Sequence, residues 1–298
     1  MSQEALASRP ALGVPLEVLA CPACRSALAF SGGGLRCERC REEYPLAGGV
    51  PLLLTPDDAR RFGARLTEAG GRAMEVRYRE RYSSALATRL RQALRPPLPL
   101  IDDPREPRLP RPDGSLNLYI GGGGRTVAGF LNLDIRPFPG VGLVGNAERL
   151  PLGDAVLDGV ECDAVLEHVE HPETALREVF RALKPGGFFH VVVPFCHPFH
   201  AYPADFRRWT LFGLEDSLRE TGFSIIASGV RTGPTATLLT FVLEYGKLAA
   251  GGGLAGKAVY AALGWFLFPL RYLDLWLNRR PSAHLLANHV FALARKPN

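Results

Sequence analysis

The sequence lacks the features that would direct a protein out of the cytoplasm or into a membrane. Residues 1–15 contain no basic region followed by a sustained apolar segment, so no secretory signal peptide is expected. An apolar segment near the carboxyl end has an uncharged core from Ala258 to Leu270, which is shorter than the roughly 20 residues that a membrane-spanning helix requires. No internal repeat is evident. We therefore expect a cytoplasmic protein.

Neither sign of charge dominates the sequence. The formal net charge of the 298 residues is only +5, and much of the excess arginine lies between Arg60 and Arg111. This stretch consists of a predicted helical segment (57–94) and a proline-rich linker that ends at residue 112. The arginines are interpreted as a solvated helix face, with a patch for RNA, phosphorylated sugars or anionic lipid as the alternative. Nucleic acid is the less favoured partner, because basic and aromatic residues are not interleaved in a recognisable binding motif.

Cysteine is scarce, and four of the six cysteines form two CxxC pairs near the amino end, Cys21 with Cys24 and Cys37 with Cys40. Four thiolates at this spacing can surround a zinc ion tetrahedrally, and the residues between the pairs fit one hairpin. Disulfides are the alternative, but a reducing cytoplasm favours a structural metal. A closed four-cysteine site has no open coordination position, so no catalysis is expected there. We predict a zinc ribbon over residues 1–56.

A glycine run in the middle of the chain is placed between two strand candidates. Leu116 to Ile120 alternates apolar and polar residues, and Gly121 to Gly124 follow at once. The second candidate, Phe130 to Ile135, brings Asp134 to its carboxyl end, where a carboxylate can accept hydrogen bonds from both hydroxyls of a ribose. A nicotinamide-binding fingerprint would need an acid about 20 residues after the glycines, and Asp134 comes too early for it.

Three further motifs follow in order: AERLP from Ala147, LEHV from Leu166 and LKPGG from Leu183. With the glycine run and Asp134 they resemble the LEHV/LKPGG subgroup of the class I S-adenosylmethionine-dependent methyltransferases, over about residues 115–232. The resemblance implies an α/β fold, a Rossmann-like doubly wound sheet of seven strands with an antiparallel last strand. It also implies S-adenosylmethionine as cofactor. The residues that it assigns to the cofactor are Gly121, Gly122, Gly123, Asp134, Asn146, Ala147 and Glu167.

The amino-terminal cysteine segment looks like the small zinc-ribbon domains that accompany or activate methyltransferases. Two positions depart from the family pattern. Tyr119 stands where the family has an acidic residue, and the crossover from Gly124 to Phe130 is shorter than the dozen residues that parallel strands normally need. We expect a single helical turn there and a larger share of cofactor recognition for Asp134. The alternatives are a methyltransferase-like scaffold without turnover and an RNA methyltransferase.

The segment from Pro194 to Thr210 follows a predicted strand end, where open α/β sheets bind their ligands. Methyl transfer to a hydroxyl requires alignment and removal of a proton. His197 and His200 are candidate bases, and Asp205 could orient one of them. Other groups are also candidates here: an acceptor clamp by Arg207 or Arg208, and a catalytic role for His168 in LEHV. The alternative is a loop held together by its own hydrogen bonds.

The methyltransferase domain is predicted over residues 113–298, with a final strand over 287–297 and a hydrophobic helical insertion at about 233–284. Core helices or a dimer surface would explain the insertion. The alternative is peripheral membrane contact through residues 258–280, anchored by Trp265, Trp276, Arg271 and Arg279. This alternative would suit a lipid-linked acceptor. The predicted function is methyl transfer to a small-molecule, glycan or lipid-linked acceptor.

Overall fold

The computed structural model describes residues 12–67, 95–123 and 127–298. Its amino-terminal part is a small antiparallel sheet of three strands that carries the four paired cysteines. A 3-10 turn, η2 (Leu16–Val18), precedes this sheet, and Gly32 and Gly33 make the first hairpin turn with φ of 55° and 85°. The strands are β1 (Leu28–Ser31), β2 (Gly34–Cys37) and β3 (Glu43–Tyr44).

The main sheet has nine strands in the described part of the chain, in the order β11-β12-β10-β9-β6-β7-β8-β5-β4. Seven of them, β6 to β12, form the methyltransferase-type sheet that the motifs imply, and β12 is antiparallel to both of its neighbours, β10 and β11. This confirms the predicted fold class. The strands are β4 (Leu46–Ala47), β5 (Val50–Leu53), β6 (Asn117–Ile120), β7 (Phe130–Asp134), β8 (Leu143–Gly145), β9 (Leu157–Asp163), β10 (Leu183–Pro194), β11 (Ser224–Thr232) and β12 (His289–Arg295).

The ribbon is joined to this sheet rather than tethered beside it. Strand β5 pairs in parallel with β8, with Leu52 opposite Val144, and so extends the sheet by one edge. Buried ribbon residues such as Leu35 and Tyr44 belong to the same apolar cluster as the main-sheet core. Because the two parts share one core, loss of the ribbon would expose apolar surface of the main sheet.

Helix α1 (Pro56–Thr67) begins shortly after β5, with Thr55 as its N-cap. The Thr55 hydroxyl accepts a hydrogen bond from the Asp58 amide at 3.1 Å, and it donates one to the Asp58 carboxylate at 2.7 Å. The predicted helical segment 57–94 thus has a helix over its first part, and residues 68–94 lie outside the described residues.

Helices α4 (Pro172–Ala182) and α5 (Leu211–Thr221) cover one face of the main sheet. Apolar residues of α4 recur at helical spacing and enter the core cluster. Thr210 caps α5 by accepting a hydrogen bond from the Gly213 amide, and Gly222 ends it with a φ of 107°. These are the crossover helices that the sequence predicts after LEHV and after the segment from Pro194 to Thr210.

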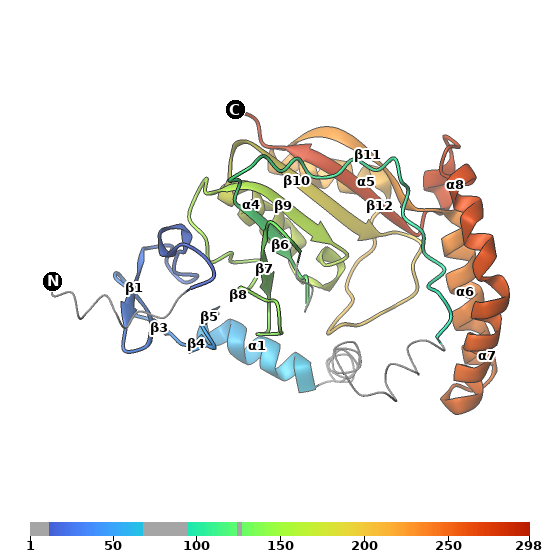
Figure 1. Cartoon of the computed structure of the whole chain (residues 1–298), viewed down its shortest axis with the longest axis horizontal. Helices are drawn as coiled ribbons and strands as arrows, with labels where there is room; N and C mark the ends of the chain where they lie inside the picture. Colours follow the sequence, from blue (N-terminus) through green and yellow to red (C-terminus); the bar gives the residue numbers. More distant parts are fainter. Residues whose placement is uncertain (1–11, 68–94, 124–126) are drawn as a thin grey trace.

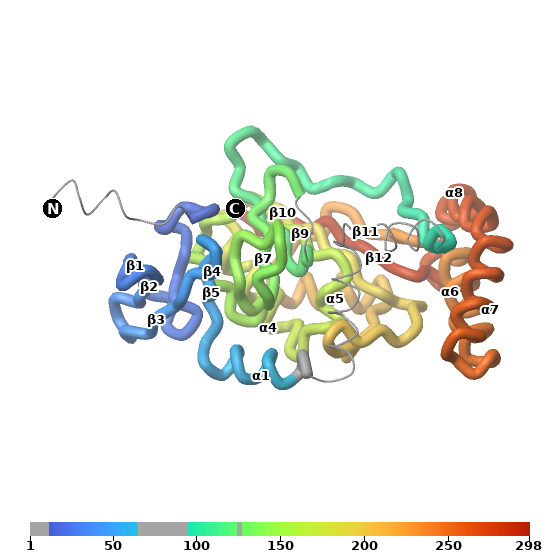
Figure 2. Tube along the Cα trace, turned by 60° about the horizontal axis from the view of Figure 1, so that its bottom comes forward, coloured from blue at the N-terminus to red at the C-terminus, as the bar shows by residue number. Residues whose placement is uncertain are grey.

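The opposite face is covered by the proline-rich segment 95–116, which runs along the sheet as an extended strap (Figure 1, Figure 2). Leu109 is buried over Gly159, where a Cβ atom would lie 2.8 Å from the leucine side chain. The Asp103 amide donates to the Arg231 carbonyl at 2.8 Å. The described residues of the β6–β7 and β7–β8 connections contain no helix, and the strap occupies the face that longer crossovers would cover.

A helical insertion separates β11 from β12 and stands at one edge of the sheet (Figure 1). Two of its helices pack closely, because a Cβ atom at Gly246 would lie 2.6 Å from Leu263. The continuous helical stretch Gly253–Leu277 is, by length and composition alone, long and apolar enough to cross a membrane, and 11% of its most apolar window is buried. This stretch is longer than the uncharged core seen in the sequence. The helices are α6 (Pro234–Ala249), α7 (Gly253–Leu267), η4 (Phe268–Leu273), α8 (Asp274–Leu277) and η5 (Ala283–Leu286).

Candidate active site and zinc centre

The four ribbon cysteines converge on one point. The sulfur atoms of Cys21 and Cys40 are 3.6 Å apart, those of Cys24 and Cys37 are 3.4 Å apart, and all four lie within 4.8 Å of one another. A tetrahedral zinc ion with Zn–S bonds of about 2.3 Å needs sulfur atoms about 3.8 Å apart, so the thiols fit zinc. A hydrogen bond from the Ser26 backbone lowers the pKa of Cys24 to about 6, which favours the thiolate that zinc binds.

The glycine bend and Asp134 are in direct contact at the carboxyl ends of β6 and β7. The Gly123 amide donates to Oδ2 of Asp134 at 3.0 Å. Gly121 and Gly123 have φ of 72° and 54°, a conformation that side chains disfavour, and a Cβ at Gly121 would lie 2.3 Å from Val165. Burial raises the pKa of Asp134 to about 6, against the hydrogen bonds from the backbone that lower it.

A nucleoside fits this chemistry, because a carboxylate beside a close-approach backbone bend is what a ribose requires. Asp134 would accept the hydroxyl groups of the ribose, and the bend would bring the main chain near the rest of the cofactor. Tyr119, the departure from the family pattern, is buried and packs edge-on against Phe130 with ring centroids 5.8 Å apart. It therefore contributes to packing under the strap.

Asn146 and Ala147, assigned to the adenine, are buried after β8 and lie under the start of α1. Asn146 Nδ2 donates to the Asp58 carboxylate at 2.8 Å, and its Oδ1 accepts from the Glu148 amide at 2.9 Å. Arg61 of α1 holds Glu148 at 3.1 Å. The helix that follows the ribbon therefore positions the segment to which the resemblance assigns adenine contact. Asp58 and Arg61 were not among the predicted site residues, although Thr55-Pro-Asp-Asp is a recognisable helix start.

Four histidines lie in a row at the same edge of the sheet, and we call them the histidine row: His168, His200, His197 and His289. Ring centroids of successive members are 5.0, 4.7 and 5.0 Å apart. They come from three places, the turn after β9, the loop after β10 and the first residue of β12. Because β12 runs antiparallel, its start meets the carboxyl ends of the parallel strands. His289 was not predicted, since its position beside the others depends on that reversal.

His197 is held by Asn288, which is fully buried and was likewise not predicted. Asn288 Nδ2 donates to the Cys196 carbonyl at 2.9 Å, so Oδ1 of the amide must face His197 Nδ1, 2.8 Å away. An amide oxygen only accepts, which places the proton of the neutral ring on Nδ1 and leaves Nε2 basic. Desolvation lowers the pKa of His197, so the neutral ring predominates at neutral pH.

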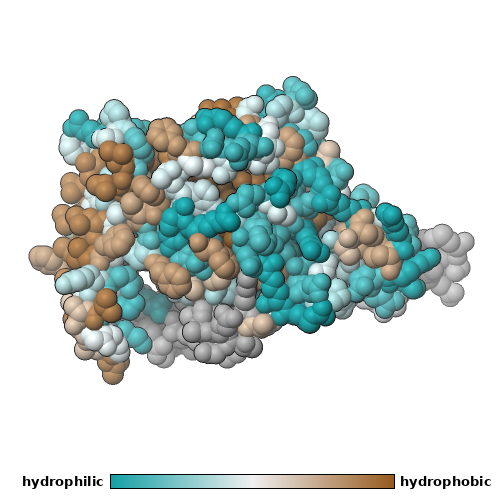
Figure 3. All heavy atoms as spheres, turned by 180° about the vertical axis from the view of Figure 1, so that it is seen from behind, coloured by the Kyte–Doolittle hydropathy of each residue, from teal (hydrophilic) through white to brown (hydrophobic). Residues whose placement is uncertain are grey.

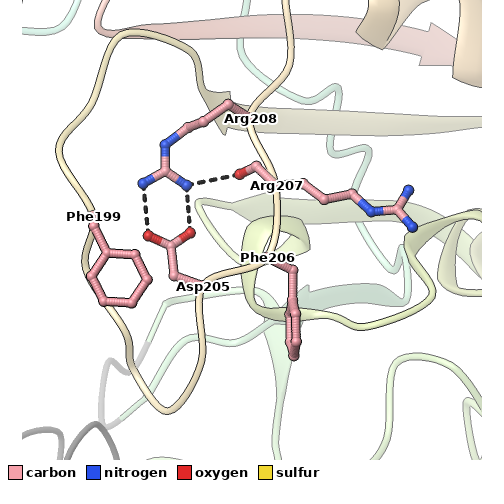
Figure 4. A pocket seen from close by; sticks show the side chains of 5 residues that line it. All are labelled: Phe199, Asp205, Phe206, Arg207 and Arg208. Atoms are coloured by element: carbon pink, nitrogen blue, oxygen red, sulfur yellow. Dashed lines mark hydrogen bonds and ion pairs between the residues drawn. The ribbon is translucent and has the colours of Figure 1, made fainter.

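Asp205 and Arg208 form a two-point ion pair within the loop after β10 (Figure 4), and the Arg208 Nε also donates to the His197 carbonyl. Asp205 accepts from the His200 amide at 2.7 Å, so it holds the histidine through the backbone. Arg207 points away and pairs with Glu173. These residues line an open hollow of about 290 Å³ together with Phe199 and Phe206. Both arginines proposed as acceptor clamps are thus already paired with carboxylates.

His168 and Glu167 lie in the turn η3 (Leu166–His168) after β9. His168 Nδ1 is hydrogen-bonded to the Ala204 carbonyl. Glu167, assigned to the cofactor by the resemblance, is fully buried, and its carboxylate faces His168 and His200. The predicted catalytic residues His168, His197, His200 and Asp205 are therefore brought together, whereas Gly121, Gly122, Gly123 and Asp134 form a separate group at β6 and β7.

Comparisons with known proteins match the two parts of the chain separately. Residues 131–191 match the methyltransferase domain family, and residues 16–49 match the Trm112p-like protein family. A segment of 46 residues is 46% identical to the ubiquinone/menaquinone biosynthesis C-methyltransferase UbiE of Rubrivivax gelatinosus, and it covers 15% of this chain and 18% of that protein. A segment of 49 residues is 41% identical to a UPF0434 protein of Nitrosococcus oceani, covering 16% of this chain and 81% of that protein.

Two solved structures resemble the fold at low identity. One is the complex between the Haloferax volcanii Trm112 methyltransferase activator and a methyltransferase, with 16% identity, coverage of 82% of this chain and 98% of that chain, and a TM-score of 0.41. The other is the Haemonchus contortus phosphoethanolamine N-methyltransferase 2 with S-adenosylmethionine, with 19% identity, coverage of 63% and 50%, and a TM-score of 0.41.

The sheet order, the cysteine cluster and the two family matches agree with one another. The chain therefore contains an S-adenosylmethionine-dependent methyltransferase domain and an amino-terminal Trm112-like zinc-ribbon domain.

Proposed function

We propose that this protein transfers a methyl group from S-adenosylmethionine to a hydroxyl group of a small acceptor carried on a lipid. The observation that carries the proposal is the position of the helical insertion relative to the histidine row. Thr232, the last residue of β11, has its hydroxyl 3.0 Å from His289 Nδ1 in the histidine row. Asn288, directly before β12, is hydrogen-bonded to His197. The insertion therefore begins and ends at the candidate catalytic groups.

S-adenosylmethionine supplies an electrophilic methyl group, and its transfer to oxygen leaves the electron pair of the broken C–S bond on sulfur. The protein must hold the acceptor in line and remove the hydroxyl proton. His197 suits the second task, because Asn288 fixes its Nδ1–H and leaves Nε2 free to accept a proton. The proton passes from the acceptor oxygen to Nε2 as the C–O bond forms.

A large apolar surface supports the lipid part of the proposal. We call the α6–α7 pair with η4 and α8 the apolar arm, and Figure 3 shows its hydrophobic side chains gathered at one edge of the molecule. Contiguous exposed apolar patches larger than a few hundred Å² are uncommon on soluble monomers and mark interaction sites. The exposed apolar residues of the arm are Leu238, Phe241, Tyr245, Leu248, Leu254, Trp265, Phe266, Leu270, Tyr272, Leu273, Leu275 and Trp276.

Basic side chains accompany these residues, as in helices that lie in the interface of an anionic membrane. Lys247 and Lys257 are exposed on the helix pair, and Arg279 and Arg280 follow α8. Arg280 lies over the Trp276 ring at 4.4 Å. Aromatic and cationic groups together favour contact with lipid headgroups.

The arm is tied to the body of the protein, which favours peripheral contact over a membrane crossing. Asp274, fully buried, accepts hydrogen bonds from the Thr235 and Ala236 amides at 2.8 and 2.9 Å and so caps the start of α6. Arg271 donates to the Leu98 carbonyl of the strap at 2.9 Å. A helix crossing a bilayer would have to break these bonds and bury both charges.

We expect the chain to bind anionic vesicles at low salt and Phe266→Asp to weaken this binding by roughly 10-fold or more, since burial of a phenylalanine contributes about 1.5–3 kcal/mol. Phe266 is 80% exposed, so the substitution leaves the core intact. Co-sedimentation with vesicles measures the effect, and Ile226→Asp, at an exposed position on β11, is the control. If the wild-type chain does not bind vesicles at low salt, the lipid-linked acceptor is excluded.

Replacing His197 by glutamine is expected to lower turnover by about 10²–10⁴-fold, the usual contribution of a general base, with little change in S-adenosylmethionine affinity. A screen of lipid-extract fractions for transfer of labelled methyl groups supplies the assay, and calorimetry measures the cofactor. Because the pKa of His197 is lowered, wild-type kcat/KM should stay constant as the pH falls past about 6.5, the ordinary histidine pKa, and should decline only at lower pH. Equal turnover in the variant and the wild type would refute the role of His197.

A further inference from the structure

The carboxylate of Glu167 is the most unusual group in the site. Its side chain is fully buried, and within the described part of the chain neither of its oxygens has a hydrogen-bond partner. Burying a charged carboxylate without donors costs several kcal/mol or more, so such a group is normally paired or bound to a cation. Among the described residues, the protein alone therefore gives the Glu167 carboxylate no group that balances its charge through a hydrogen bond.

Two histidine nitrogens face the same carboxylate oxygen. Nε2 of His200 lies 3.4 Å and Nε2 of His168 lies 3.7 Å from Glu167 Oε1, and the three atoms that could act as ligands lie within 4.8 Å of one another. These separations are long for hydrogen bonds. They approach the roughly 3.0–3.4 Å between neighbouring ligands of a metal bound at about 2.1 Å.

The other nitrogen of each ring lies near a group that accepts hydrogen bonds, and that of His200 also lies 3.4 Å from Nη2 of Arg208. His168 Nδ1 is bonded to the Ala204 carbonyl, and His200 Nδ1 lies 3.2 Å from the Pro198 carbonyl and 3.5 Å from Asp205. His168 therefore carries its proton on Nδ1 and points its Nε2 lone pair at Glu167, and a metal ion bound at Nε2 would select the same tautomer of His200. Metal-binding histidines show this arrangement, in which a carbonyl or carboxylate fixes the tautomer.

We propose that Glu167, His168 and His200 bind a divalent first-row transition-metal ion. Two imidazoles and one carboxylate suit such ions and leave positions open for further ligands. This site is separate from the ribbon, which has four sulfur ligands and no open position. Its geometry distinguishes it from a hydrogen-bonded structural cluster, because among the described residues neither oxygen of the Glu167 carboxylate has a hydrogen-bond partner.

The catalytic consequence rests on the proposed function. An open position on the ion would take the acceptor hydroxyl oxygen, lower its pKa and hold it beside His197, whose ring centroid lies 4.7 Å from that of His200. The hydroxyl proton then goes to His197 Nε2, and the oxygen keeps the electron pair that forms the bond to the methyl carbon. No oxidant or reductant takes part.

Mn²⁺ tests the site directly, because this ion prefers oxygen and nitrogen ligands and does not compete for the thiolates of the ribbon. We expect the full-length, zinc-loaded chain to bind one equivalent of Mn²⁺, seen as loss of the free-ion electron paramagnetic resonance signal. Glu167→Gln and His200→Gln should each weaken this binding by more than roughly 100-fold, since loss of a ligand exceeds the cost of losing an outer partner. His284→Gln, at a half-buried histidine outside the histidine row, is the matched control.

A wild-type chain that binds neither Mn²⁺ nor a second equivalent of Zn²⁺ would overturn the proposal, and so would a Glu167→Gln chain with unchanged affinity. Should a variant fail to fold, as judged by thermal melting, the wild-type stoichiometry decides. The readout needs no acceptor, so the two proposals can fail separately. Metal binding without hydroxyl methylation would contradict the proposed function. Methylation at an unchanged rate after the metal is removed would contradict the catalytic role of the metal.

Discussion

Replacing Cys37 by serine is expected to unfold the ribbon and, through it, to weaken cofactor binding. Cys37 is fully buried among the four convergent thiols, and structural zinc supplies about 10–16 kcal/mol of apparent binding energy in peptides of this kind. The loss would not stop at the ribbon, because β5 forms the neighbour of β8 and continues into α1. Without α1, Asn146 loses the Asp58 carboxylate that holds it.

Three measurements check this expectation. Zinc content should fall from one equivalent to near zero, the thermal midpoint should fall, and S-adenosylmethionine affinity measured by calorimetry should fall by about 10-fold or more, as when one hydrogen bond to a charged group is lost. Cys196→Ser is the matched control, because Cys196 is a free thiol outside the ribbon. Wild-type affinity in a zinc-free Cys37→Ser chain would show that the ribbon folds independently of the cofactor site.

The zinc ribbon and the order of the sheet were predictable because their signals are local. Two cysteine pairs at this spacing indicate a metal site from a short stretch of sequence alone. The motifs from Gly121 to Gly187 likewise follow the ends of successive predicted strands. Asp134 was predictable for the same reason. It follows its strand directly, and parallel strands bring their carboxyl ends to one edge whatever covers their faces.

The parts that could not be predicted depend on contacts between distant segments. The strap 95–116 has the composition of a linker, yet it is packed because Glu106 lies 2.8 Å from His190 and 2.7 Å from Arg231, two buried or half-buried side chains of β10 and β11. Proline-rich sequence carries no periodicity that would reveal a buried face. The addition of β5 to the sheet is likewise a long-range pairing, with no signal in either strand alone.

The candidate site shows the same division. His168, His197 and His200 were predicted because they follow strand ends in sequence. Asn288, however, reaches His197 from 91 residues away and could be found only once β12 was known to run antiparallel. The arginine clamp stays a prediction, and its surroundings could not be predicted, since sequence separation does not reveal that Asp205 binds Arg208 at two points.

Replacing Asp134 by alanine is expected to weaken S-adenosylmethionine binding by about 100-fold or more, because hydrogen bonds to a charged group contribute about 1.5–3 kcal/mol each. The wild-type affinity should also depend on pH. The pKa of Asp134 is about 6 in the free protein, so the acid is protonated below that pH, and a protonated carboxyl is a poorer acceptor for ribose hydroxyls. Affinity should therefore be highest above pH 7 and fall by up to about tenfold per pH unit below 6.

Calorimetric titrations between pH 5 and pH 8 measure this dependence, with Asp134→Asn and Asp113→Asn as the paired variants. Asp134→Asn removes the titrating group and should give a weak affinity that does not change with pH. Asp113 is exposed in the loop before β6, so its substitution should preserve the wild-type profile. A profile that persists in Asp134→Asn would assign the titration to another group. Absence of any binding heat from the wild-type chain would instead favour a methyltransferase-like scaffold, because Asp134 and the glycine bend would then be in contact without serving a cofactor.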